Sequence, residues 1–220
     1  MVTANKGPVA FAHKRLTSLA LRRKKRFLFE GAVMDGTPIF NLVTRCLRAN
    51  RVVGFRGALN STTTRILTSI EAGGTFESAL RAAQDAGVAE ADPSADLEGW
   101  DAAVKGCAIA NALMGGSLTP RDVDRTGLGG DVSRRVASAL RSGCKLRLVV
   151  RGRRQGRSVS VRVAPEELPA DDLLVSRGAD GVVVLETDLM GEIGIWEGAG
   201  GVDQTAYAIL SDLLAIVERA

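Results

Sequence analysis

The sequence is poor in the residues that mark disulfide-rich, metal-binding or histidine-dependent proteins. Its 220 residues include three cysteines and one histidine. The odd cysteine count and the lack of metal-ligand spacing argue against a disulfide framework and predict small buried thiols in a reducing compartment. The single histidine, His13, lies in a predicted helix without nearby partners, which argues against a catalytic triad or a histidine metal site.

Long apolar runs are also missing. No segment approaches the roughly 18 consecutive apolar residues of a membrane-spanning helix, and the N-terminus lacks the basic and apolar regions of a signal peptide. We therefore expect a cytoplasmic protein that does not bind a membrane. Only 4% of the residues are aromatic while 45% are hydrophobic, so the core must consist mainly of Ala, Val, Leu and Ile.

The charge is mildly basic and mostly dispersed. A net charge of +4 permits an anionic ligand such as a phosphorylated nucleotide. One basic run, Arg22-Arg-Lys-Lys-Arg26, ends a predicted helix, where cations interact favourably with the helix dipole. Nucleic-acid binding through this run and through Arg147–Arg162 is an alternative. No aromatic platform or binding motif accompanies the run, which favours a solvated helix end and no nucleic-acid partner.

The hydrophobic pattern predicts an α/β (α+β-like) fold. Helical spacing covers residues 7–26, 39–49, 62–72, 76–86, 97–114, 131–141 and 203–219, and strand patterns cover 27–33, 51–58, 145–151, 158–163, 181–187 and 192–196. The two strands before and after Gly152–Gly156 form a hairpin with one cationic face. We expect a mixed, largely antiparallel sheet with helices packed on one face. The exposed hairpin face is compatible with oligomer formation or with simple solvation.

The most informative stretch runs from Ala86 to Lys105 and holds five carboxylates followed by one lysine. Asp101 and Lys105 lie four residues apart and therefore share one face of the predicted helix. Most such pairs are solvated surface salt bridges worth about 0.3–0.5 kcal/mol. The helix is otherwise almost entirely apolar or small, however, and a lysine in such surroundings needs a charged partner. The sequence therefore leaves two interpretations, a surface pair or a buried functional pair.

This stretch resembles the catalytic signature of the homoserine dehydrogenases. The resemblance rests on Ala89-Glu-Ala-Asp-Pro93 followed by Asp96-Leu-Glu-Gly-Trp-Asp-Ala-Ala-Val-Lys105. Further blocks match the family in the same order, at Met1–Lys6, Phe29–Pro38, Gly57–Thr63 and Gly198–Asp212. Together the blocks span nearly the whole chain and are highly specific. The fold implied is that of the homoserine dehydrogenase catalytic domain.

The resemblance implies an oxidoreductase that interconverts L-homoserine and L-aspartate 4-semialdehyde with NADP or NAD. This step belongs to threonine, methionine and isoleucine biosynthesis, and the family resemblance also implies a homodimer. The implied domains are residues 1–26 as the end of the nucleotide-binding domain, 27–196 as the substrate-binding, catalytic and dimerisation domain, and 197–220 as a C-terminal helix that returns to the nucleotide-binding side.

The matched blocks also imply residue roles. By resemblance, Lys105 is the proton donor and acceptor for the substrate hydroxyl, and Lys6 is a second catalytic lysine that also contacts the cofactor. The remaining implied sites are Glu90, Asp101 and Asp96 for substrate, Gly87 and Gly200 for cofactor, and Glu30, Val33, Asp35 and Thr37 for a monovalent cation such as sodium.

Other positions depart from the family pattern. A strand followed by Gly-x-Gly-x-x-Gly and a helix usually marks a nicotinamide enzyme, and this sequence has no such segment. The family carries that loop ahead of the block that matches Thr3–Lys6, so we expect this chain to be the substrate half. Arg65, Val88 and Ala95 replace the family's usual Tyr, Tyr and Asp, which affects cofactor contacts more than the Lys, Asp and Glu residues.

Two hypotheses follow from these patterns. One is an enzyme represented here by its substrate half. The alternative is a non-catalytic remnant or split-subunit module that dimerises and binds an amino acid without turning it over. The retention of Lys6, Glu90, Asp101 and Lys105 favours the enzyme, because a drifting remnant would have no chemical reason to keep all four.

Overall fold

The computed structural model describes residues 1–175, 181–198 and 200–218. In chain order the elements are α1 (Lys6–Arg22), η1 (Glu30–Ala32), η2 (Leu42–Cys46), β1 (Val52–Ala58), α2 (Ser61–Glu71), α3 (Phe76–Asp85), α4 (Ser94–Leu97), α5 (Trp100–Leu113), η3 (Pro120–Asp122), β2 (Asp124–Arg125), α6 (Val132–Arg141), β3 (Cys144–Gln155), β4 (Ser158–Pro169), η4 (Leu173–Val175), β5 (Gly181–Thr187), β6 (Gly191–Glu197) and α7 (Val202–Val217).

The strands form a six-stranded sheet in the order β2-β4-β3-β1-β5-β6. Neighbouring strands run antiparallel except for the short β2, which pairs parallel with β4. The hairpin of β3 and β4 is the longest pairing and extends from Cys144 opposite Pro169 to Gln155 opposite Ser158. The predicted mixed, largely antiparallel sheet is therefore confirmed.

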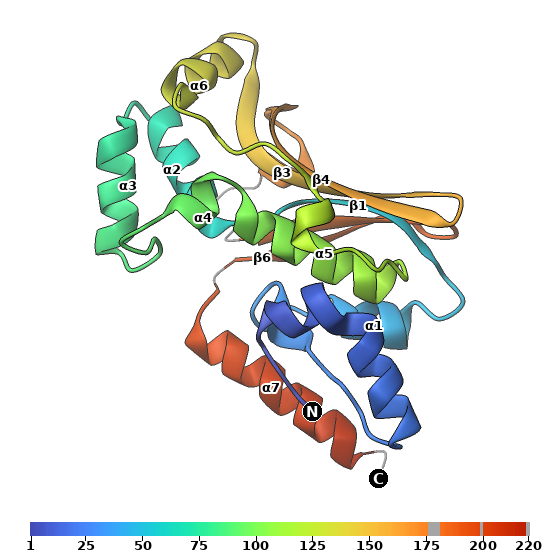
Figure 1. The fold of residues 1–220 in the computed structure, drawn as a ribbon. Coiled ribbons are helices and arrows are strands. Elements are labelled where there is room, and N and C mark those ends of the chain that lie inside the picture. The colour runs from blue at the N-terminus through green and yellow to red at the C-terminus, as the bar shows by residue number, and fades with distance from the viewer. Residues whose placement is uncertain (176–180, 199, 219–220) are drawn as a thin grey trace.

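The helices are arranged in successive layers away from this sheet (Figure 1). Helix α5 packs against β3 and β4, and α1 packs against the other side of α5. Helix α7 contacts η1, and the N-terminus of the chain lies beside α7 (Figure 1). Within the described residues, no helix has the length and apolarity needed to cross a bilayer.

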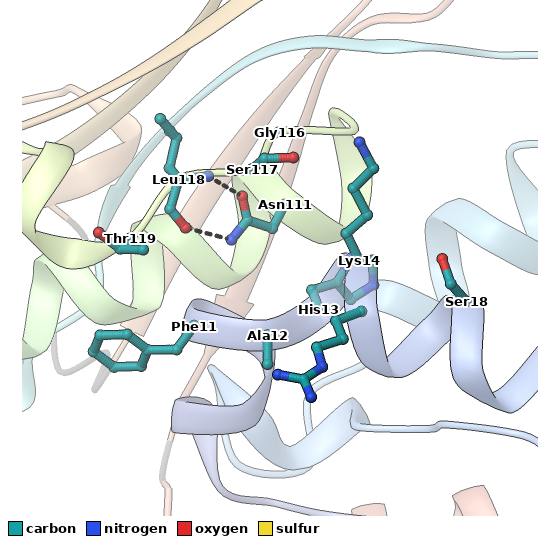
Figure 2. A pocket seen from close by; sticks show the side chains of 11 residues that line it. Phe11, Ala12, His13, Lys14, Ser18, Asn111, Gly116, Ser117, Leu118 and Thr119 are labelled. Carbon is teal, nitrogen blue, oxygen red and sulfur yellow. Dashed lines mark hydrogen bonds between the residues drawn. The ribbon is translucent and has the colours of Figure 1, made fainter.

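A buried amide side chain joins α1 to the end of α5. Asn111 is 4% exposed, and its Nδ2 donates to the carbonyl oxygens of Ala10 (3.0 Å) and Leu118 (2.8 Å). Its Oδ1 accepts the Leu118 backbone N–H at 2.9 Å. Figure 2 shows the two bonds to Leu118 beside a cavity of about 320 Å³ between α1 and the loop after α5. These bonds fix the position of α1, which carries Lys6 at its N-terminus.

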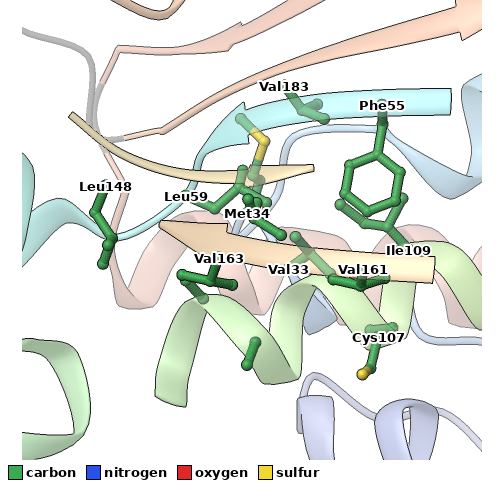
Figure 3. Packing of buried hydrophobic residues seen from close by; sticks show 14 of the residues in the cluster. Val33, Met34, Phe55, Leu59, Cys107, Ile109, Leu148, Val161, Val163 and Val183 are labelled. Carbon is green, nitrogen blue, oxygen red and sulfur yellow. The ribbon is translucent and has the colours of Figure 1, made fainter. Parts of the chain in front are cut away.

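The main core lies between α5 and the sheet (Figure 3). Its largest fully buried side chains include Phe55, Leu59 and Ile109, as expected for a core with few aromatics. Gly106 allows the close approach of α5, because a Cβ there would lie 2.6 Å from Val150 Cγ2. The helix therefore lies directly on the sheet, with the neighbouring Lys105 at the edge of the contact.

The predicted elements at 27–33 and 39–49 differ from the structure. Residues 27–33 were expected to form a strand, but Leu28 makes only an isolated parallel bridge with Val2 before the η1 turn. The reason is a contact distant in sequence, since the Glu30 backbone N–H donates to Asp212 on α7 at 2.9 Å rather than to a strand. The segment predicted as helix 39–49 is wound partly as a π-helix, with Leu47 N–H bonded to the Leu42 carbonyl oxygen.

Candidate active site

A break between two helices positions the Asp101 and Lys105 pair. The sequence predicted one helix over 97–114, whereas the structure has α4 and then α5, separated at Gly99. Gly99 adopts φ +81°, a left-handed conformation that is favourable mainly for glycine. Asp101 then lies in the first turn of α5, and Lys105 follows one turn later. Lys105 Nζ lies 3.3 Å from Asp101 Oδ2.

The pair is buried rather than solvated. The Asp101 side chain is 11% exposed and that of Lys105 is 20% exposed, so the interpretation as a surface salt bridge was wrong. Lys105 Nζ also donates to the Leu59 carbonyl oxygen at 2.6 Å. The apolar character of α5 accounts for this burial, because most of the residues around Lys105 on the helix are inside the protein.

A second lysine reaches Asp101 from the other helix. Lys6 Nζ at the start of α1 donates to Asp101 Oδ1. Burial alone would raise the pKa of Asp101, but the charges of Lys105 and Lys6 outweigh it and lower the pKa to about 2. The carboxylate is therefore ionised at neutral pH and lies between two cations.

A cavity of about 270 Å³ opens beside this cluster. Its lining combines the lysine, one guanidinium, two carboxylates and several glycines: Val33, Met34, Asp35, Leu59, Ser61, Arg65, Gly87, Val88, Lys105, Gly181, Glu197, Gly200 and Gly201. The structure thus brings Lys105 together with Gly87 and Gly200, which the resemblance implied as cofactor contacts. Glycine backbones along the wall leave room for a flat ligand to approach closely.

The carboxylates of the 90–101 segment occupy different environments. Asp96 is half-buried and its Oδ1 accepts a hydrogen bond from Asn60 Nδ2 at 2.7 Å. Glu90 is exposed on the loop after α3 and is not among the described residues that line the cavity. The structure therefore joins Asp96 and Asp101 through one amide and leaves Glu90 outside the described lining of the cavity.

The segment implied as a cation site divides into two parts. Glu30 is 4% exposed, and its two carboxylate oxygens accept the backbone N–H groups of Phe40 (2.9 Å) and Asn41 (2.6 Å). Val33 and Asp35 line the cavity instead, and Thr37 Oγ1 donates to Glu197 Oε1 at 3.3 Å. Within the described part of the chain, no group of three or more His, Cys, Asp or Glu side chains could hold a metal ion.

Sequence reasoning missed two polar residues of α2 and its cap. Asn60 lies in the matched block Gly57–Thr63 but was assigned no role in the site, yet it contacts both Asp96 and Asp101. Arg65 was noted only as a departure from a family pattern, yet it lines the cavity with Lys105. The signal for Arg65 was its spacing, because Ser61 and Arg65 lie four residues apart and share one face of α2.

Comparison with known proteins gives consistent results. A family model described as homoserine dehydrogenase matches residues 38–214. The chain is 36% identical over 222 residues to an NAD(+)-dependent homoserine dehydrogenase from Pseudomonas canavaninivorans and 37% identical over 217 residues to a homoserine dehydrogenase from Methanocaldococcus jannaschii. These alignments cover 100% and 98% of this chain but 63% of each relative.

Solved structures agree with the sequence relatives. A putative homoserine dehydrogenase from Archaeoglobus fulgidus superposes with a TM-score of 0.89 at 35% identity, covering 98% of this chain and 66% of the other. A hyperthermophilic archaeal homoserine dehydrogenase in complex with NADPH superposes with a TM-score of 0.82 at 27% identity, covering 100% of this chain and 64% of the other. In both comparisons, about a third of the other chain lies outside the match.

Proposed function

This chain belongs to the homoserine dehydrogenase family, and we propose that it forms the substrate-binding and catalytic half of an enzyme that interconverts L-homoserine and L-aspartate 4-semialdehyde. The observation that carries the proposal is the cluster of Lys6, Asp101 and Lys105 beside the cavity, in which the Asp101 and Lys105 side chains are largely buried. Homoserine is a small amino acid with a side-chain hydroxyl, and a cavity of about 270 Å³ accommodates a molecule of that size.

Lys105 is proposed as the group that exchanges the hydroxyl proton. Oxidation of the alcohol removes a proton from oxygen and a hydride from the adjacent carbon, so a base must lie within hydrogen-bond reach of the hydroxyl. Lys105 lines the cavity, and its Nζ is held by Asp101 and the Leu59 carbonyl oxygen. Lys6 adds a second positive charge close to Asp101, which would stabilise the negative charge developing on the substrate oxygen.

The remaining polar groups match the other charges of the substrate. Asp101, Asp96 and Glu90 are proposed to bind the ammonium and hydroxyl groups. Arg65 lies on the cavity wall and presents a planar guanidinium, the side chain best suited to a carboxylate. An amino acid in the cavity would thus lie near both carboxylates and cations.

A nicotinamide cofactor is proposed to bind in the same cavity, next to Lys105. One relative is named as NAD(+)-dependent and one structural neighbour contains NADPH. Gly87 and Gly200 fit this proposal because they line the wall next to Lys105 without side chains. When bound, the cofactor supplies the hydride acceptor or donor, while Lys6 and Lys105 remain the residues that act on the substrate oxygen.

Residues 1–26 and 197–220 are proposed to complete a nucleotide-binding domain, with 27–196 as the substrate-binding, catalytic and dimerisation domain. The relatives are longer than the part this chain matches, and α7 exposes an apolar face that the described residues do not cover. That face consists of Val202, Tyr207, Ile209, Leu210, Leu213, Leu214 and Val217. A helix with such a face requires packing against another element to be fully stable.

A second copy of the chain is proposed on the sheet face opposite α5. Val149, Val182 and Val184 form a separate apolar cluster on that face. Trp196 pairs with Val182 in the sheet register and is 56% exposed next to this cluster. Exposed aromatic residues beside apolar side chains are typical of interfaces. Sedimentation analysis should give a dimer, and Trp196→Lys should shift it toward the monomer.

A monovalent cation is also proposed, with Glu30, Val33, Asp35 and Thr37 as its neighbours. Burial raises the pKa of Glu30 to about 7, and a bound cation would favour the ionised carboxylate. Carboxylate and backbone oxygens are the ligands that hard cations prefer. If the site binds sodium, thermal stability at pH 7 should be higher in sodium chloride than in choline chloride at equal ionic strength, and this difference should vanish in Glu30→Gln.

Calorimetric titration with L-homoserine tests the central proposal. The folded chain should bind L-homoserine, and Asp101→Ala should lose that binding. Once a nucleotide-binding domain is present, addition of NADP or NAD should give hydride transfer. The absorbance of the reduced nicotinamide monitors this step. No binding to the folded wild-type chain would contradict the proposal and favour the alternative of a non-catalytic assembly module.

A further inference from the structure

Asn60 donates hydrogen bonds to two carboxylates of the site, Asp96 and Asp101. It is 4% exposed and precedes α2 as its N-cap residue. Its Nδ2 donates to Asp96 Oδ1 at 2.7 Å and to Asp101 Oδ2 at 3.0 Å. An amide nitrogen carries two hydrogens, so each carboxylate receives one of them.

The orientation of the amide is fixed by its other end. Asn60 Oδ1 accepts the backbone N–H of Thr63 at 2.8 Å, which is the capping bond of α2. If the amide were flipped, its NH₂ group would face the Thr63 N–H and its oxygen would face two carboxylates. Every strong interaction of the side chain would then be lost, so the hydrogen-bond pattern determines which atom is the nitrogen.

We propose that Asn60 is a positioning residue of the active site, which uses one side-chain amide to hold Asp96 and Asp101 at a fixed spacing beside the two lysines. Asp96 comes from α4 and Asp101 from α5, and these helices meet at the flexible backbone position Gly99. The Asn60 amide ties the two helices together on the side that faces Lys105. This proposal deepens the proposed function, because the two carboxylates are the groups assigned to the substrate.

Physical chemistry explains why an amide suits this position. Two carboxylates close together repel each other, and a donor shared between them offsets part of that repulsion. An amide donates two hydrogen bonds without adding charge, so the positive charges of Lys6 and Lys105 remain available to Asp101 and the substrate. A hydroxyl in the same place has one hydrogen and cannot reach both carboxylates.

Two substitutions separate this role from helix capping. Asn60→Ser retains a good N-cap acceptor but removes both amide donors. Asn60→Asp also retains the cap but adds a third carboxylate to the site. Thr75→Ala is the matched control, because Thr75 caps α3 through Ser78 and lies away from the cavity.

A double-mutant cycle with Asp101→Asn provides the readout that capping alone would not change. In urea denaturation, Asn60→Ser should reduce the folding equilibrium constant about tenfold in the wild-type background and much less beside Asp101→Asn, since contacting residues are coupled. Asn60→Asp should reduce it further in the wild-type background. Thr75→Ala should have the same effect in both backgrounds. Equal effects of Asn60→Ser in the two backgrounds would overturn the proposal.

L-homoserine binding gives a second, functional readout. Its dissociation constant should rise about tenfold in Asn60→Ser and stay unchanged in Thr75→Ala. An unchanged dissociation constant in Asn60→Ser would show that the amide does not position Asp96 and Asp101 for substrate binding. If the wild-type chain binds no L-homoserine, the proposed function fails, whereas the double-mutant cycle still decides whether Asn60 couples to Asp101.

Discussion

The stability of this protein should depend on pH through one buried carboxyl group. Glu30 is 4% exposed. Burial raises its pKa from 4.5 to about 7, and the charge of Asp212 acts in the same direction against the lowering effect of the Asn41 and Phe40 N–H groups. Asp212 itself is 2% exposed and accepts the Glu30 backbone N–H. Two carboxyl groups are thus buried together where α7 meets η1.

The sign of the effect follows from proton binding. Because the folded protein binds the Glu30 proton more tightly than the unfolded chain, this group contributes stability that is fully present below pH 4.5 and is lost as the pH rises to about 7. At about 1.4 kcal/mol per pKa unit, the free energy of unfolding should fall by about 3 kcal/mol across this window. That is a large share of the roughly 5–15 kcal/mol of a typical domain.

Urea denaturation of the wild type and Glu30→Gln at pH 5, 6, 7 and 8 measures this contribution. The amide of Gln places an NH₂ group against the backbone N–H of Phe40 or Asn41. This contact lowers the free energy of unfolding by the same amount at every pH. The difference between the two proteins should therefore shrink by about 3 kcal/mol as the pH rises. His13, whose pKa is lowered by burial, acts in the opposite direction but is present in both proteins and cancels.

Glu77→Gln is the matched control, since Glu77 is an exposed carboxylate of α3. It should follow the wild-type pH dependence. The reasoning would be refuted if the unfolding free energies of wild type and Glu30→Gln ran parallel from pH 5 to 8. Such a result would mean that the N–H groups of Phe40 and Asn41 compensate the burial of the carboxylate completely.

Three further outcomes are expected. In an enzyme complete with its nucleotide-binding domain, Lys105→Met should lower kcat for homoserine oxidation by about 10²–10⁴ with little change in KM, and an unchanged kcat would remove Lys105 from proton transfer. Asp101→Asn should lower the free energy of unfolding by about 2 kcal/mol at pH 7 and by little near pH 2, because the pKa of the Asp101 carboxyl group is about 2 in the folded protein and 3.8 in the unfolded chain. A loss that is the same at all pH values in urea titrations would contradict this. Gly106→Ala should lower the free energy of unfolding by about 1–3 kcal/mol through overpacking against Val150, and a calorimetric melting temperature equal to wild type would show that α5 can shift.

The regular elements could be predicted from the sequence because their signals are local. The alternation of apolar and polar residues in the sequence of the hairpin, the capping of α3 by Thr75 and the positive φ of Gly87 after α3 all depend on neighbouring residues. The predicted strand at 27–33 failed for the opposite reason. Its apolar residues fit a strand, but Asp212, 182 positions away, takes the Glu30 backbone N–H.

The chemistry of the site was only partly visible in the sequence. Asp101 and Lys105 could be paired because a helix brings residues four apart together, although their burial depends on α5 lying directly on the sheet. Lys6 is 95 positions from Asp101 in sequence, and only the family resemblance placed it in the site. Glu90 is exposed and outside the described lining of the cavity, so its role in substrate binding stays a prediction from the resemblance.

Asn60 combines a helix-capping role with contacts to two carboxylates of the site. The sequence explains its Oδ1, because Asn is a favourable N-cap and Thr63 lies three residues on. The same bond turns Nδ2 away from the helix, so a capping asparagine always presents an amide donor to whatever lies beyond the helix start. Here Asp96 and Asp101, 36 and 41 positions away, lie beyond it. A serine or aspartate would cap α2 equally well, so the requirement for Asn arises from the two carboxylates and not from the helix.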